Sequence, residues 1–425
     1  MSEAKLRIGI AGLGTVGKQV AHAILSGTLP GVILTHVVIR DISKDRGLDL
    51  SSVSIGTDPL ALADPDNGID LIVELMGGED GEALDLVKGA LNSGKSVVTA
   101  NKAMLARHAM ELATLADNNK QSLGFEAAVA GGIPIIKTIR EALAGNKVTR
   151  LSGILNGTCN FILSQMTDTG AAFDDVLKRA QDLGYAEADP SFDIGGIDAA
   201  QKLTLLASLA YGVKPDLSAV SLRGITEITA RDISAATDFK CSIRLVALAE
   251  GSGGATSLWV GPALLRRSHP LSQINGVTNA VVISAEPVGE LILQGPGAGG
   301  GATASAVLGD IADIAGGYGR PLFVHPVSDL VDAQSANQKL ESAWYLRFLL
   351  ADTAGSMASV TQILAKNGVS IEEAIQRAPS DGETHLPVVF ITHKTDESAV
   401  QKAILEVKEL SGIAADVLCL PVFAD

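Results

Sequence analysis

Cysteine is scarce in this chain of 425 residues, which has three cysteines and no CxxC pair. Cys159, Cys241 and Cys419 lie far apart and outside any cluster of cysteine and histidine. This sparse, odd-numbered set argues against a disulfide framework or a structural zinc site, and it fits a reducing compartment. The histidines form no HExxH pair, and neither GxSxG nor GxxxxGKS/T occurs. A catalytic transition metal, a hydrolase and a nucleotide triphosphatase therefore lack support.

Basic residues are also in the minority, with 33 Lys and Arg against 48 Asp and Glu, a net charge of −15. An acidic surface repels phosphate groups, so we expect no general binding of nucleic acid or of anionic membranes. The apolar runs stop well short of the ~20 residues that a bilayer requires. The first residues lead straight into a strand, without the basic and apolar segments of a signal peptide. These features predict a soluble, cytoplasmic protein.

What the chain has is length for about three domains and 47% apolar residues, enough for large buried cores. In the first third, short β-rich runs alternate with helical segments, which predicts βαβ crossovers and a mainly parallel sheet. The expected strands are Leu6–Ala11, Val32–Ile39, Leu71–Leu75, Ser96–Ala100 and Ser122–Val129, and the expected helices include Val16–Leu25 and Glu82–Ser93.

The middle of the chain mixes helices with later strands, and a polar stretch at 326–338 predicts a linker. The last eighty or so residues have the order strand, helix, strand, strand, helix, strand, which is typical of a ferredoxin-like sandwich. The expected elements of the two regions are Phe173–Leu183, Gly195–Tyr211, Ser257–Val260, Ala280–Ala285, a helix from Gly301 through Ile314, Tyr345–Ala351, Ser356–Asn367, Ser370–Ile375, His385–Thr392, Asp396–Leu410 and Val417–Phe423, with a turn at Pro379–Gly382.

A GxGxxG motif follows the first expected strand and opens a helix, as in dinucleotide-binding domains. Its glycines allow a tight turn and the close approach of a pyrophosphate, whose charge is stabilised at the helix N-terminus. An ordinary tight turn is the alternative, and the βαβ context disfavours it. The motif consists of Gly12, Leu13, Gly14, Thr15, Val16 and Gly17.

The end of the second expected strand bears on the choice of cofactor. Asp41 there would suit the ribose hydroxyls of NAD, whereas Arg40 and Lys44 would suit the 2′-phosphate of NADP. Two basic residues favour NADP, with NAD possible and a solvated charged loop as the alternative.

Two lysines are candidates for acid–base chemistry. Asp198 and Lys202 are four residues apart and share a helix face with Leu205 and Leu209, so we expect a partly buried pair rather than a surface ion pair. A lysine held by an aspartate near a carbonyl could hand over a proton. Lys102 follows the strand Ser96–Ala100, at the carboxyl edge where ligands bind in such sheets. Taken alone it is an unremarkable surface residue.

Two turns precede helices. Asn156–Phe161, with the sequence NGTCNF, reads by itself as a helix-capping turn. The glycine-rich loop at 295–301 is either a flexible link or a second anion-binding site at a helix N-terminus.

These segments together resemble the homoserine dehydrogenase family over essentially the whole chain. The shared motifs are GLGTVG at 12–17, TANK at 99–102, FEAAVAGGIPII at 125–136, GILNGTCNFIL at 153–163, GYAEADPSFDIGGIDAAQKL at 184–203 and GPGAGGGATASAVLGD at 295–310. The resemblance implies NAD(P)-dependent interconversion of L-aspartate 4-semialdehyde and L-homoserine. It places the chain in threonine, methionine and isoleucine biosynthesis.

The resemblance also implies roles for individual residues. Lys202 would donate the proton to the aldehyde oxygen, Lys102 would assist and Asp198 would orient Lys202. Gly299 would approach the cofactor from the second glycine loop, and Lys102 would also lie beside the cofactor. The implied substrate-binding residues are Glu187, Asp193, Gly157 and Thr158.

Two further sites come from the resemblance alone. A monovalent cation, usually sodium, would be held by Glu126, Val129, Gly131 and Ile133. The C-terminal unit resembles an ACT domain, in which the loop from Asp352 to Gly355 would receive an amino-acid effector, with threonine feedback as the implied regulation. The alternative is an ACT domain used only for oligomerisation.

The predicted fold is α/β, with a Rossmann-like domain, an inserted α+β domain for substrate binding and dimerisation, and a ferredoxin-like (βαββαβ) ACT domain. The expected ranges are 1–134 (completed by about 299–325), 135–298, a linker at 326–342 and 343–425. We expect a homodimer or homotetramer. The rival hypotheses are another semialdehyde or amino-acid dehydrogenase, disfavoured by the motif at 184–203, and a catalytically silent NADP-binding amino-acid sensor, disfavoured by Lys102, Asp198 and Lys202 together.

Overall fold

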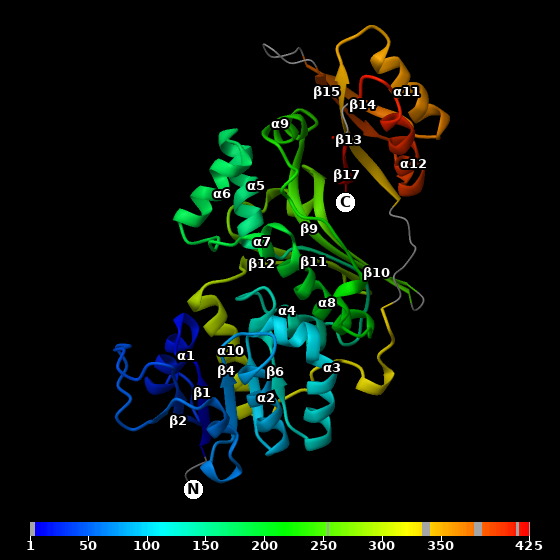
Figure 1. The fold of residues 1–425 in the computed structure, drawn as a ribbon. Coiled ribbons are helices and arrows are strands. Elements are labelled where there is room, and N and C mark those ends of the chain that lie inside the picture. Colours follow the sequence, from blue (N-terminus) through cyan, green and yellow to red (C-terminus); the bar gives the residue numbers. More distant parts are fainter. Residues whose placement is uncertain (1–4, 253–254, 334–340, 378–384, 414–415, 425) are drawn as a thin grey trace.

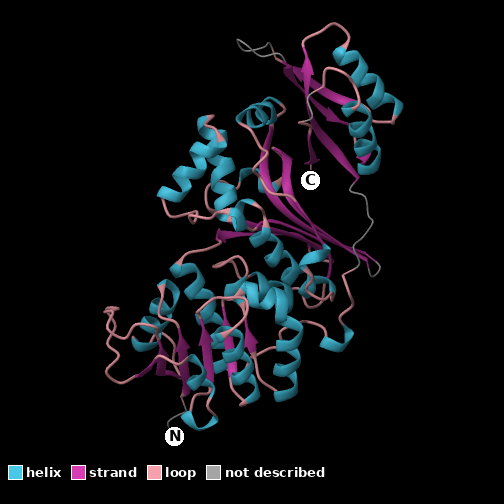
Figure 2. Ribbon diagram, in the orientation of Figure 1, coloured by secondary structure: helices cyan, strands magenta, loops and turns pink. Residues whose placement is uncertain are grey.

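The structure, a computed structural model, describes residues 5–252, 255–333, 341–377, 385–413 and 416–424 (Figure 1). In this part of the chain the strands form one sheet of six and one of eleven, with helices between and around them (Figure 2). The helices of the described residues are all too short or too polar to cross a bilayer.

The first sheet has the strand order β3-β2-β1-β4-β5-β6, and all its pairs are parallel. This is the Rossmann order, which puts ligands at the carboxyl ends of the strands. The sheet and its helices confirm the predicted α/β class. Their bounds are β1 Leu6–Ala11, α1 Thr15–Leu25, β2 Val32–Val38, β3 Ser54–Gly56, β4 Leu71–Glu74, α2 Glu82–Asn92, β5 Ser96–Thr99, α3 Lys102–Asn119 and β6 Leu123–Gly124.

Successive side chains along each strand point to opposite faces of the sheet, and different helices cover the two faces. Ile72 and Val97 point into a core with α2 and α3, whereas Val73 and Val98 point into a second core with α1 and α10 (Gly300–Ala315). Figure 1 shows α10 beside α1, although the two are far apart in the sequence. The late helix therefore completes the first domain.

The strand expected at Ser122–Val129 is wrong after Gly124. β6 ends there, and a 3-10 turn follows at Glu126–Ala128. A Cβ on Gly124 would lie 2.8 Å from the Asp310 Cβ, and the Glu126 N–H donates to the Asp310 carboxylate at 2.8 Å. The chain is thus pressed against α10 and bonded to it, so its apolar residues are buried without continuing the ladder.

The second sheet begins with the order β12-β11-β7-β9-β10. The helix α8 (Ile197–Tyr211) lies between the two sheets, in contact with α3 on one side and with β9 and β10 on the other, and residues 198–209 are all buried. The other elements are α4 Ile135–Lys137, β7 Lys147–Ile154, α5 Gly157–Thr169, α6 Phe173–Asp182, α7 Ser191–Ile194, β8 Val220–Leu222, α9 Ala230–Asp238, β9 Cys241–Ser252, β10 Ala255–Arg266, β11 Thr278–Glu286 and β12 Gly289–Pro296.

Apart from the additional two-residue strand β16, the C-terminal unit has the predicted βαββαβ order, and its main strands pair antiparallel as β17-β13-β15-β14. One face packs on α11 and α12. The turn expected at Pro379–Gly382 lies outside the described residues. The bounds are β13 Glu341–Ala351, α11 Ser356–Lys366, β14 Ile371–Gln376, β15 His385–Thr392, β16 Thr395–Asp396, α12 Glu397–Lys408 and β17 Leu418–Phe423.

This C-terminal sheet is continuous with the sheet of the middle domain. β17 pairs parallel with β10, with Val422 opposite Leu264 and Phe423 opposite Leu265. The face of the unit turned away from α11 and α12 joins the core of the middle domain through Tyr345 and its neighbours. Nothing in the sequence pattern indicated this pairing.

Candidate active site

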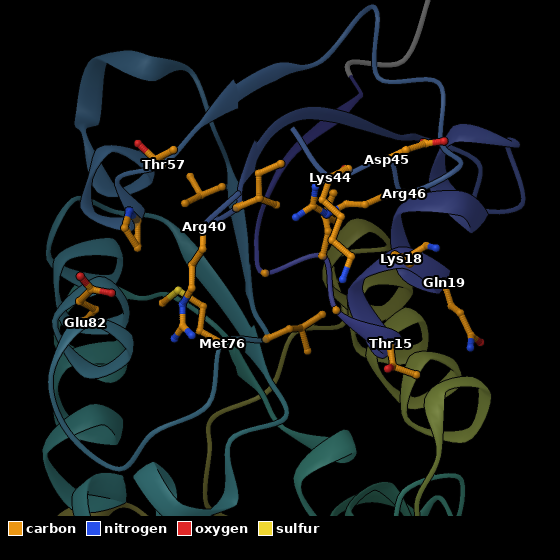
Figure 3. A pocket seen from close by; sticks show the side chains of 17 residues that line it. Thr15, Lys18, Gln19, Arg40, Lys44, Asp45, Arg46, Thr57, Met76 and Glu82 are labelled. Carbon is orange, nitrogen blue, oxygen red and sulfur yellow. Dashed lines mark hydrogen bonds between the residues drawn. The ribbon is translucent and has the colours of Figure 1, made fainter. Parts of the chain in front are cut away.

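A cleft of about 870 Å³ opens over the first glycine loop, at the carboxyl end of β1 (Figure 3). Gly12, Leu13, Gly14 and Thr15 line it. Gly12 has a φ of +99°, and a Cβ on Gly14 would meet nothing within 4 Å, so Gly14 leaves room for a ligand. A Cβ on Gly17 would lie 2.0 Å from the Gly12 carbonyl oxygen, so Gly17 allows the close packing of α1 on the loop. These three positions match the requirements of a pyrophosphate-binding turn.

Several basic side chains line this cleft. Arg40, Lys44, Arg46 and Lys18 line it, and Figure 3 shows Lys18, Lys44 and Arg46 gathered near the start of α1. Asp41 is instead held within its own loop, where its carboxylate accepts bonds from the Ser43 N–H at 2.9 Å and hydroxyl at 2.6 Å. Sequence reasoning missed Lys18, which follows the glycine motif by one residue.

A second cavity, of about 600 Å³, brings together most of the predicted substrate and catalytic residues. It lies where α3, α5 and α8 meet the glycine loop before α10. The predicted residues that line it are Lys102, Gly131, Gly157, Thr158, Asp193, Asp198, Lys202 and Gly299.

Asp198 forms the centre of a charged cluster in this cavity. One carboxylate oxygen lies 2.8 Å from the Lys202 Nζ and the other lies 3.1 Å from the Lys102 Nζ. Burial by itself raises the pKa of Asp198, but the two ammonium charges and hydrogen bonds from Lys202 and Asn156 outweigh it and lower the pKa to about 2. Asp198 is therefore ionised at neutral pH and lies between two positively charged side chains. The Lys202 Nζ also donates to the Leu155 carbonyl at 2.7 Å, which fixes its position.

The polar turn before α5 supports this cluster. Asn156 caps α5 and donates to Asp193 and Asp198. Gly157 is required because a Cβ there would lie 2.9 Å from the Val277 carbonyl, and the Thr158 hydroxyl donates to the Tyr185 carbonyl at 2.7 Å. The capping turn expected from the sequence is thus part of the cavity wall.

Glu187 does not lie with the other predicted substrate-binding residues in the second cavity. Its side chain is exposed, it is not among the residues lining the cavity, and its backbone carbonyl accepts a bond from Gln181 at 3.1 Å. The structure places it on the loop before α7.

Comparison with known proteins gives this geometry a family. Two family models, described as "Homoserine dehydrogenase, NAD binding domain" and "Homoserine dehydrogenase", match residues 12–126 and 134–312. A homoserine dehydrogenase of Helicobacter pylori is 39% identical over 416 residues, covering 96% of this chain and 97% of the relative. One from Neisseria gonorrhoeae is 40% identical over 420 residues, covering 95% of both chains. The chain belongs to the homoserine dehydrogenase family.

Members of the homoserine dehydrogenase family are oxidoreductases acting on a CH–OH group, and an ACT domain model matches residues 344–412 here. The crystal structure of a homoserine dehydrogenase from Thiobacillus denitrificans superimposes with a TM-score of 0.90 at 36% identity, covering 99% of this chain and 98% of that one. A hyperthermophilic archaeal homoserine dehydrogenase in complex with NADPH, 34% identical with a TM-score of 0.62, covers 73% of this chain and 97% of its own. NAD(P) binding is thereby supported.

The residues that the homoserine dehydrogenase resemblance assigned to a cation lie around one buried turn. Both carboxylate oxygens of Glu126 accept backbone N–H bonds, from Ile136 at 2.8 Å and Lys137 at 2.9 Å. Burial raises the pKa of Glu126 to about 7 despite these bonds. Ala130 and Gly131 follow with φ values of +56° and +53°, a conformation that redirects successive carbonyls. In the described residues no three His, Cys, Asp or Glu side chains cluster as metal ligands.

The expected effector loop is in the ACT unit and is not among the residues that line either cavity. Asp352 and Gly355 are exposed between β13 and α11, and Gly355 has a φ of +97° at the start of the helix.

Proposed function

We propose that this chain interconverts L-homoserine and L-aspartate 4-semialdehyde, with Lys202 as the acid–base residue. One observation carries the proposal: a buried lysine, held by Asp198 and the Leu155 carbonyl, lines the same cavity as Lys102 and the second glycine loop. When bound, the nicotinamide cofactor supplies or accepts the hydride.

In this mechanism the protein aligns the carbonyl and manages its proton. Lys202 gives a proton to the aldehyde oxygen during reduction and takes the hydroxyl proton of homoserine in the reverse direction. Asp198 holds Lys202 and Lys102 on its two oxygens, so both positive charges face the developing oxyanion. The carboxylate of Asp193, on the cavity wall, accepts a hydrogen bond from the substrate ammonium group. We assign Glu187 to the same ammonium, which requires the loop before α7 to move inward.

NADP is the proposed cofactor. Arg40, Lys44, Arg46 and Lys18 on the cleft wall favour a phosphorylated ribose, and Asp41 is not among the residues that line the cleft. Arg40→Ala should raise the KM for NADP more than the KM for NAD. An equal rise for both would remove Arg40 from the phosphate site.

We further propose a place in threonine, methionine and isoleucine biosynthesis, in the cytoplasm, as a homodimer or homotetramer. Threonine would act as a feedback effector at the ACT loop around Asp352 and Gly355. A monovalent cation, sodium first, would be held by the Glu126 carboxylate and the carbonyls of Val129, Gly131 and Ile133. The positive φ values of the turn, which redirect its carbonyls, support this donor set.

The test is to follow the NADPH absorbance band with purified protein and L-homoserine, offering NADP and NAD separately, with and without L-threonine. Homoserine-dependent reduction supports the reaction, and slower turnover with threonine supports the feedback role. If the protein binds NADP but reduces neither cofactor, the silent-sensor alternative replaces this proposal. Turnover with another hydroxy amino acid but not with homoserine would point to another dehydrogenase.

A further inference from the structure

We infer that Asn156 is a positioning residue of the reaction, because its single amide holds Asp193 and Asp198 in fixed positions around Lys202. The inference rests on the proposed function, since it assigns this work to the same cavity. Its structural basis is a hydrogen-bond pattern that uses both ends of one buried side chain.

The Asn156 amide cannot rotate without losing a bond. Its Oδ1 accepts the Cys159 N–H at 2.8 Å, which fixes the oxygen toward α5. Its Nδ2 then faces the cavity and donates to the Asp193 Oδ1 at 2.7 Å and the Asp198 Oδ2 at 2.9 Å. Both N–H groups and the oxygen are used, and the residue is only 4% exposed. An amide in this state is a rigid support.

The bridge joins two groups of like charge. Two carboxylates close together repel one another, and an amide NH2 group that donates one N–H to each of them offsets that repulsion. Lys202 depends on the same arrangement, because its Nζ binds the Asp198 oxygen that also accepts the Asn156 N–H. The neighbouring carbonyl of Leu155 binds the Lys202 Nζ at 2.7 Å and the Asn279 amide at 3.0 Å. The junction of β7 and α5 therefore sets the geometry of the whole cluster.

The charges around Asp193 define what happens if the amide is lost. Asp193 faces the carboxylate of Asp198 and the ammonium groups of Lys202 and Lys102, and its backbone carbonyl accepts a bond from the Cys159 thiol. Burial is the main cause that raises the pKa of Asp193, and the charge of Asp198 raises this pKa further. The hydrogen bond from Asn156 lowers the same pKa. Removing the amide should raise the pKa of Asp193 further, so that it takes up a proton at higher pH and loses its hold on an ammonium group.

Asn156→Ser is the informative variant, because a serine hydroxyl still caps a helix but cannot reach two carboxylates. We expect kcat/KM for homoserine to fall by about 10- to 100-fold, as for other small misplacements of reacting groups. The acid limb of its pH profile should move to higher pH. In an Asp193→Asn background the same substitution should leave the acid limb unmoved. Unchanged thermal stability would separate these effects from a lost cap.

A second readout does not need turnover. The Asp193 carboxyl carbon, labelled with 13C and assigned with Asp193→Asn, gives its titration directly by NMR in the parent and in Asn156→Ser. A titration midpoint that rises in the variant supports the link between Asn156 and Asp193 independently of turnover. If the midpoint rises but the parent shows no homoserine-dependent turnover, the proposed function fails, and with it the role of Asn156 in that reaction, while the bridge between the carboxylates stands. Superimposable titrations together with unaltered kcat/KM would overturn the inference.

Discussion

Single residues in the second cavity differ in burial although they share one partner. The side chain of Lys202 is 10% exposed and that of Lys102 is 33% exposed, and both contact Asp198. Lys202 is a buried ammonium with two fixed acceptors and is therefore the better defined proton donor. Lys102 is more exposed and is suited to stabilising the developing negative charge at the edge of the cavity.

Lys202→Met should therefore lower kcat by about 10²- to 10⁴-fold, the usual contribution of a general acid or base. The Kd for NADP should stay nearly unchanged, because Lys202 does not line the cofactor cleft. Steady-state rates and fluorescence titration with NADPH measure the two quantities. Lys88→Met, which removes a lysine paired with Glu111 far from the cavity, is the matched control. Normal turnover with weakened NADP binding would contradict the assigned role.

Glu126 carries a second prediction at this scale. Replacing tetramethylammonium with sodium at constant ionic strength should raise the melting temperature of the parent by a few degrees, because a ligand that binds only the folded state stabilises it. Glu126→Gln should abolish this dependence. Glu74→Gln is the control, since Glu74 is also a buried carboxylate bonded to backbone N–H groups but lies outside the proposed site. Equal sodium dependence in both variants would dismiss Glu126 as a ligand.

Residue spacing predicted the Asp198–Lys202 contact, because positions four apart on a helix are neighbours. The position of Lys102 after an expected strand likewise predicted that it lies at the carboxyl edge of the sheet, where β5 ends at Thr99 and α3 begins at Lys102. Residue spacing could not predict the bond between Glu126 and Asp310, which are 184 residues apart, since no local pattern records which helix returns to which strand. The second role of Asn156 was hidden for a related reason: a cap and a bridge between carboxylates look the same in sequence.

At the scale of elements, two glycines in the turn from β1 into α1 have different functions: Gly17 allows close packing, and Gly14 leaves space for a ligand. Gly17→Ala should cost about 1–3 kcal/mol of stability, as overpacking does, because its Cβ would lie 2.0 Å from the Gly12 carbonyl oxygen. Gly14→Ala should leave the melting temperature unchanged and still weaken NADP binding, since the space in front of Gly14 is open. Calorimetry and NADPH titration distinguish the two. Gly145→Ala, at an exposed turn with nothing within 4 Å, is the control.

The element boundaries show where pattern reasoning works. The central strands β1, β2, β4 and β5 lie where continuous apolar runs predicted them, because both faces of that sheet are covered, whereas the short edge strand β3 was not predicted. The run at Ser122–Val129 is equally apolar, yet most of it is a buried turn, since burial next to α10 selects apolar residues without requiring a strand. An apolar run therefore indicates that a segment is buried, whereas its contacts with other elements decide whether it forms a strand or a turn.

At the scale of the whole molecule, the ACT unit is held to the middle domain by a buried ion pair as well as by strand pairing. Arg347 on β13 contacts Asp232 on α9, and the Tyr345 hydroxyl donates to the other Asp232 oxygen at 2.8 Å. Arg347 and Asp232 are 4% and 0% exposed. The βαββαβ order was predictable from the sequence, but this docking was not, because its contacts span more than a hundred residues.

Arg347→Met should destabilise the protein by about 3–5 kcal/mol, because it leaves the Asp232 carboxylate buried without its cation. Chemical denaturation monitored by circular dichroism measures the loss. Arg377→Met is the matched control at the same boundary, where an exposed pair with Asp238 should contribute less than about 1 kcal/mol. If both variants lose the same amount, the buried pair has no special part in holding the two units together.

The position of β17 also constrains how the protein is made. β17 contains residues 418–423, and it lies between β10 of the middle domain and β13 of the ACT unit. Because synthesis proceeds from the N-terminus, the first domain with its returning helix α10 is complete well before this strand leaves the ribosome. The eleven-stranded sheet can close only after residues 418–423 have been made. A chain that lacked these residues would leave β10 and β13 without the strand that joins them.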